Sequence, residues 1–213
     1  METIERPDVV IAADIAFSLA SDPAVSASWD AESACAGMTV GGLAHHLVGQ
    51  IRHIVNLLAA PPTDQPPIPL LEHYERAAWV GAPADDEANT SIRDSDNAAA
   101  DAGPAAVLGE IPPLLDRLPG LLVALRSPDT IFIPWQGWAL ATDDFLVMRS
   151  MELVVHSDDL AASVGLPTPT FPDSTAAHVV DLLAAIAMRR HGQAAIVRAL
   201  SRPQRAPGSV SAF

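Results

Sequence analysis

The chain has 213 residues, of which 49% are hydrophobic and only 5% aromatic, and its formal net charge is −14. This length suits one sizeable domain, and alanine, leucine and valine in place of aromatic residues favour helices. The negative charge argues against nucleic acid and against an anionic membrane surface as partners, because both need a basic face.

Targeting and redox features are few. A single cysteine, Cys35, excludes an internal disulfide and fits a reducing compartment. The N-terminus lacks the basic start and apolar run of a signal peptide, and no apolar run approaches the roughly 18 residues of a membrane span. We therefore expect a cytoplasmic protein, and a homodimer is compatible with the sequence.

Helical spacing of apolar residues dominates the first half of the chain. The second expected helix begins with Thr39 as its N-cap and ends before Pro61. The helices predicted in this half cover residues 7–19, 39–60, 68–80 and 85–100.

Prolines and tryptophans punctuate the second half. Pro112 and Pro113 predict a bend near Ile111, or two stacked helices, because proline removes backbone hydrogen bonds. Trp135 and Trp138 either plug the core beneath a loop or form the apolar side of a pocket. The elements predicted in this half are helices at 104–126, 142–164 (capped by the Thr142 hydroxyl), 173–190 and 193–200, and a strand or turn at 129–138.

These elements predict an all-α fold. We expect a four-helix bundle in which the helices share one apolar core and the last helices pack outside it. The bundle helices are 7–19, 39–60, 104–126 and 142–164. The domain extends over residues 1–201, and a proline- and serine-rich tail follows at 202–213.

The 142–164 helix carries polar residues in an otherwise apolar sequence. At about 100° per residue, Arg149, Glu152, His156 and Asp159 fall on one side of it. Glu152 and His156 are four residues apart, so a carboxylate and an imidazole can touch the same ion, as in the His-Glu-x-x-His arrangement. Burying this set without partners would be costly, and a divalent metal is one solution.

A second interpretation needs no metal. In it, Arg149 and Glu152 form a buried ion pair and His156 bonds to a backbone carbonyl. A third ligand on another helix would favour the metal. The candidate is His46, which shares a face with Leu43, Leu47 and Gln50, although a satisfied core histidine explains it equally well.

Two motifs resemble those of a known family. Residues 38–47 read Met-Thr-Val-Gly-Gly-Leu-Ala-His-His-Leu, and residues 149–160 read Arg-x-x-Glu-x-x-x-His-x-x-Asp-Leu. Both are similar to the mycothiol-dependent maleylpyruvate isomerase N-terminal domain family, within the DinB-like superfamily of metal-binding four-helix bundles. Residues 190–192 and 198–200 are similar to the closing segment of short actinobacterial-type relatives.

The resemblance implies a metal centre and a thiol. His46, not His45, would join Glu152 and His156 as ligands of one divalent ion, usually zinc, with nickel as the other candidate. Mycothiol would be the co-substrate. From their chemistry alone, Arg149 could pair with Glu152 or with a substrate carboxylate, and Asp159 could hold a ring N–H of a histidine ligand. A structural role is the alternative for both residues.

The expected function is metal-dependent chemistry on a small molecule with a low-molecular-weight thiol, either S-transfer or thiol-assisted isomerisation. The isomerase proper carries a further C-terminal domain, and too little chain follows Pro167 for one, so we expect a reaction other than maleylpyruvate isomerisation. Two alternatives remain open. One is a thiol-independent metal-dependent hydrolase or lyase on the same site, and the other is a non-catalytic metal-binding bundle.

Overall fold

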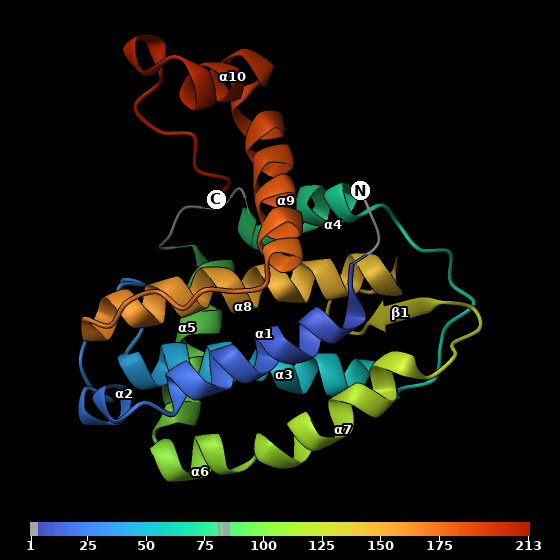
Figure 1. Cartoon of the computed structure of the whole chain (residues 1–213), viewed down its shortest axis with the longest axis vertical. Coiled ribbons are helices and arrows are strands. Elements are labelled where there is room, and N and C mark those ends of the chain that lie inside the picture. Colours follow the sequence, from blue (N-terminus) through green and yellow to red (C-terminus); the bar gives the residue numbers. More distant parts are fainter. Residues whose placement is uncertain (1–3, 81, 83–85) are drawn as a thin grey trace.

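A four-helix bundle forms the body of the protein. The computed structural model describes residues 4–80, 82 and 86–213 (Figure 1). The bundle consists of α1 (Arg6–Ala20), α3 (Val40–Ala59), α7 (Pro112–Val123) and α8 (Thr142–Val164). Both α1 and α3 pack against each of the other three. The predicted all-α bundle, with these helices as its members, is therefore confirmed.

Shorter elements surround the bundle. Helix α5 lies against α3, and α9 crosses α8 and projects away from the body with α10 at its far end (Figure 1). The remaining elements are α2 (Pro23–Ala27), α4 (Leu70–Arg76), η1 (Ala78–Val80), α5 (Glu87–Ala100), α6 (Pro104–Gly109), β1 (Thr130–Ile133), β2 (Trp138–Ala141), α9 (Asp173–His191), α10 (Gln193–Ser201) and η2 (Pro203–Arg205).

The 104–126 segment takes the second of its two expected forms. It divides into α6 and α7, because Pro112 and Pro113 have no N–H to continue the earlier helix and instead occupy the first turn of α7. Strands β1 and β2 then pair antiparallel, with Ile133 opposite Trp138. The strand or turn expected at 129–138 is thus a hairpin.

One expected cap is wrong. The N-cap of α8 is Ala141, the last residue of β2, and it makes no side-chain cap. The hydroxyl of Thr142 is buried and has no hydrogen-bond partner within the described ranges. Because the strand runs directly into the helix, Thr142 already lies in the first turn and cannot cap it.

The start of α3 is fixed more tightly than its N-cap alone requires. Thr39 Oγ1 accepts a hydrogen bond from the Gly42 N–H at 2.9 Å, as expected of the cap. A Cβ on Gly41 would lie 2.5 Å from the ring of Trp29, so only glycine allows this approach. Trp29 in turn donates its indole N–H to the carbonyl of Ala100 at 3.0 Å, which ties α3 to the end of α5.

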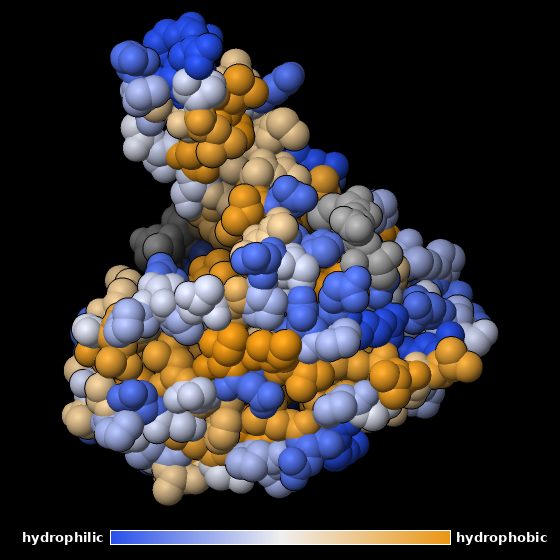
Figure 2. Space-filling view, in the orientation of Figure 1, coloured by the Kyte–Doolittle hydropathy of each residue, from blue (hydrophilic) through white to orange (hydrophobic). Residues whose placement is uncertain are grey.

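The surface of the molecule is mixed. Figure 2 shows apolar residues between the polar ones along the bundle and on the projecting end of the chain. None of the helices in the described parts of the chain is long and apolar enough to cross a membrane.

Candidate metal centre

Three side chains meet between α3 and α8. Glu152 Oε2 lies 3.1 Å from His156 Nε2 and 3.8 Å from His46 Nε2. One ligand atom from each of these residues lies within 4.8 Å of the other two, and the two imidazole rings are 4.7 Å apart, edge to face. The structure therefore brings together the three residues that the family resemblance implies as ligands.

The outer nitrogen of each imidazole is held by an aspartate. His46 Nδ1 lies 2.7 Å from Asp96 Oδ2, and His156 Nδ1 lies 3.0 Å from Asp159 Oδ2. A carboxylate at Nδ1 favours the proton on that nitrogen, so Nε2 keeps its lone pair for an ion. Histidine ligands of metals are commonly oriented in this way by an outer carboxylate.

Asp96 also determines where His45 points. Its second oxygen, Oδ1, lies 2.6 Å from His45 Nδ1, and His45 Nε2 faces Arg52 at 3.4 Å. His45 is thus directed to the same carboxylate as His46 but from the other side, away from Glu152. No motif pointed to Asp96, which lies on α5 and not on a bundle helix.

The pKa values of this cluster show strong mutual stabilisation. Burial alone would raise the pKa of Glu152, but hydrogen bonds to His156 and His46 hold it well below 4.5. Burial alone would lower the pKa of His156, but its bonds to Asp159, Cys35 and Glu152 raise it well above 6.5. Asp96 is held to a pKa of about 2 by its two histidines, against the effect of its burial. At neutral pH, Glu152 and Asp96 are therefore ionised, and His156 is the protonated imidazolium.

A divalent ion fits this set of donors. The short Glu152–His156 contact needs either a proton or a cation between the two lone pairs, and an ion at the same place can replace that proton. Two imidazoles and one carboxylate are ligands that zinc accepts, and three protein ligands leave a fourth position for a substrate or water. The carboxylate side chain of Glu152 is 13% exposed, so the position is largely sheltered from solvent.

Arg149 does not form the ion pair that the metal-free interpretation requires. Within the described residues, no carboxylate oxygen lies within 4.0 Å of its guanidinium, which instead donates to the side-chain oxygen of Gln50. Gln50 also lies 3.3 Å from His46 Nε2 through its amide nitrogen. The buried Nε of Arg149 has no hydrogen-bond partner in the described parts of the chain. Among the residues that the structure describes, His156 likewise bonds to Asp159 and not to a backbone carbonyl.

The tryptophans of the hairpin contact two further histidines. Trp135 is 53% exposed and lies against His53 with the two rings tilted and their centroids 4.7 Å apart, so it is not a core plug. Trp138 is half-buried and donates its N–H to His73 Nδ1 at 3.0 Å. Burial, with Arg149 adding to it, lowers the pKa of both His53 and His73 to about 4, so both are neutral.

Cys35 lies at the centre, although nothing in the sequence placed it among the ligands. Its sulfur, a ring nitrogen of His156 and a carboxylate oxygen of Asp159 lie within 4.8 Å of one another. Two contacts fix the loop that carries it. The Ala34 N–H donates to Ser163 of α8 at 2.9 Å, and Arg93 of α5 donates to the carbonyl of Ala36 at 3.1 Å.

Helix α5 carried a signal that could have revealed its role. Arg93, Asp96, Asn97 and Ala100 recur every three or four residues, so they share one face. Asn97 accepts from the Thr39 N–H at 2.9 Å and donates to the Gly37 carbonyl at 3.0 Å. A polar face in an acidic helix can thus be the face that packs, and not the one that meets solvent.

A helical bundle with two histidines and a glutamate converging between its helices has the architecture of the metal-binding DinB-like bundles. The family model for the mycothiol maleylpyruvate isomerase N-terminal domain matches residues 12–161, from α1 into the last turns of α8. The chain belongs to this mycothiol-associated, metal-binding family. Neither a curated protein nor a solved structure matches the chain.

The raised pKa of His156 predicts how the stability of the metal-free protein depends on pH. The stabilisation is complete below pH 6.5, near the pKa of an unfolded histidine, and is lost as the pH rises through the higher folded pKa. We expect the melting temperature of chelator-treated protein to fall as the pH rises above 6.5, and to fall less steeply in His156→Gln. The melting temperatures would be measured by scanning calorimetry. If they fall with pH equally steeply in wild type and in His156→Gln, His156 is not the protonated group.

The two bonds of Asp96 predict its effect on metal affinity. In Asp96→Asn the amide can accept from one histidine only and turns an NH₂ group toward the other. We expect zinc affinity, measured by competition with a chromophoric chelator, to fall about 10- to 100-fold. Asp94→Asn removes the same charge from an exposed position on α5 and should leave affinity nearly unchanged. Equal losses in both variants would mean that long-range charge matters and ring orientation does not.

Proposed function

We propose that this chain is a divalent-metal-dependent enzyme, with zinc as the most suitable ion. In this proposal it uses a low-molecular-weight thiol of the mycothiol type for S-transfer to, or thiol-assisted isomerisation of, a small molecule. The observation that carries the proposal is the convergence of His46, Glu152 and His156, with both outer ring nitrogens held by aspartates. Membership of the family supplies the class of thiol.

At such a centre, some residues would bind the metal ion and others would orient the residues that bind it. His46, Glu152 and His156 would hold the ion, and Glu152 would offset part of its charge. Asp96 and Asp159 would act as positioning residues that keep the Nδ1 protons in place. When bound, a divalent ion supplies a Lewis acid that lowers the pKa of a thiol or a water in its open position.

Arg149 is suited to bind negative charge on the substrate. It is a buried guanidinium whose Nε lacks a hydrogen-bond partner among the described residues and whose NH1 donates to the neutral side chain of Gln50. A guanidinium binds carboxylates well because its donors match their geometry. We assign Arg149 the orientation of an anionic group close to the three ligands.

Cys35 adds a sulfur atom to the surroundings of the proposed metal site. A sulfur atom already lies beside His156 and Asp159, between the loop and α8.

Omission of the thiol tests the proposal. Zinc-loaded protein would be supplied with mycothiol and either 1-chloro-2,4-dinitrobenzene, to detect S-transfer, or maleate, to detect isomerisation to fumarate. We expect turnover of one of these probes to require both zinc and thiol. Glu152→Gln should abolish it, and Glu110→Gln, which changes a 68% exposed carboxylate outside the centre, should not.

Two other outcomes would overturn the proposal. Hydrolysis of an activated ester at an equal rate in thiol-free buffer would assign the site to metal-activated water. If no probe turns over while Glu152→Gln changes metal content and stability, the centre binds metal without catalysing this chemistry.

A further inference from the structure

Charge is unevenly distributed along this chain. All 26 acidic residues lie at or before Asp181, together with seven arginines, whereas residues 182–213 hold five arginines and no acidic residue. The formal charge is therefore −19 for residues 1–181 and +5 for residues 182–213. The overall charge of −14 conceals an acidic body and a basic C-terminal part.

The basic part projects from the body. Helix α9 carries the chain away from α8, and α10 packs against the far end of α9 (Figure 1). We call residues 192–209 the arm. Ile196 of α10 is buried, while Val197 is 54% exposed and Leu200 80% exposed. Arg198 and Arg202 are exposed beside them. Figure 2 shows apolar and strongly hydrophilic residues side by side on this projecting end.

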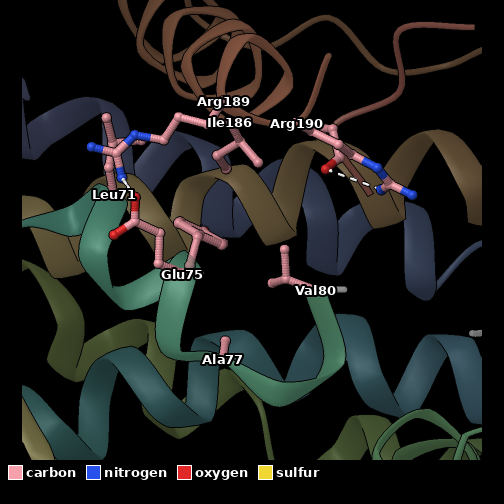
Figure 3. Close-up of a pocket in the computed structure, with 9 residues that line it drawn as sticks. Leu71, Glu75, Ala77, Val80, Ile186, Arg189 and Arg190 are labelled. Atoms are coloured by element: carbon pink, nitrogen blue, oxygen red, sulfur yellow. Dashed lines mark hydrogen bonds and ion pairs between the residues drawn. The ribbon is translucent and has the colours of Figure 1, made fainter. Parts of the chain in front are cut away.

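The arm is anchored at its base. Arg190 donates to the carbonyl of Ala212 at 3.4 Å, and His191 Nε2 lies 2.8 Å from the carbonyl of Ser211. The ring of Phe213 lies 5.0 Å from that of Trp79, which returns the chain to η1. Figure 3 shows this base, where α9 and α4 line a cavity of about 290 Å³. The arm is thus attached at both of its ends, to α9 before it and through residues 211–213 after it. It is an ordered protrusion and not a frayed terminus.

We propose that the arm docks on the acidic body of a second copy of this chain. In a two-fold symmetric dimer, each copy would place its arm on the body of the other, so the same contact forms twice. The exposed valine and leucine would be buried, and the arginines around them would meet the carboxylates of the partner. The opposite charges of the arm and the body are the reason for choosing a second copy of this chain as the partner of the arm.

Other acidic partners fit less well. Nucleic acid and anionic lipid would also be attracted to the three arginines of the arm. The body, with a charge of −19, repels both polyanions wherever they come within a Debye length of it, about 8–10 Å. A second copy turns that same acidic surface into the attractive one.

Analytical ultracentrifugation of the full chain over a range of concentrations tests the proposal. We expect wild type to approach twice the chain mass of 22.3 kDa. Leu200→Asp, a change at an exposed position, should raise the dimer dissociation constant at least about tenfold, a loss of roughly 1.4 kcal/mol. Leu200→Met keeps the apolar contact and should behave as wild type. Raising salt from about 0.1 M to 1 M should weaken association, because charges are then screened within about 3 Å.

Zinc content measured on the same samples keeps this test separate from that of the metal centre, since the arm variants should bind metal as wild type does. Wild type that stays monomeric at all concentrations would overturn the proposal. So would a dimer that Leu200→Asp leaves intact. Monomeric wild type that binds phosphatidylserine vesicles or duplex DNA through the arm would assign the arm to that partner instead.

Discussion

Glu152 places a negative charge inside a helical bundle, and the arrangement around it follows from that charge. Breaking a buried pair by removing one partner typically costs about 3–5 kcal/mol, so a buried carboxylate needs cationic or hydrogen-bonding partners at short range. His156, one turn further along α8, is one such partner, and His46 reaches the carboxylate from α3. The packing of α3 against α8 therefore brings His46 to the two candidate ligands on α8.

The bundle helices do not complete the centre alone. Asp96 comes from α5, which lies outside the four bundle helices and is fastened to the start of α3 through Asn97. The loop that carries Cys35 is attached to both α5 and α8. These outer segments contact both histidines, α5 through Asp96 and the loop through Cys35. A domain reduced to its four bundle helices would retain the three candidate ligands but lose one of their two orienting carboxylates.

Much of this arrangement could be predicted from the residues. Helical spacing of apolar side chains revealed the bundle helices, and the four-residue separation of Glu152 and His156 placed both on one face. Contacts between distant segments left weaker signals. Asp96 lies in an acidic, alanine-rich helix whose packed face is largely polar, so only the three- and four-residue spacing of its polar residues indicates which face packs. Cys35 lies in a loop whose path depends on contacts with α5 and α8. Thr142 looked like a cap because the adjoining strand was not expected to run directly into the helix.

Metal content is the measurement that tests the account most directly. Wild-type protein, purified without chelators and without metal-affinity resin, would be compared with His46→Ala by elemental mass spectrometry after incubation with zinc or nickel. We expect about one ion per chain in wild type, as three convergent protein ligands predict, and a large loss in the variant. Wild type that remains empty after both incubations would contradict the account. The centre would then be a buried polar network held together by its proton.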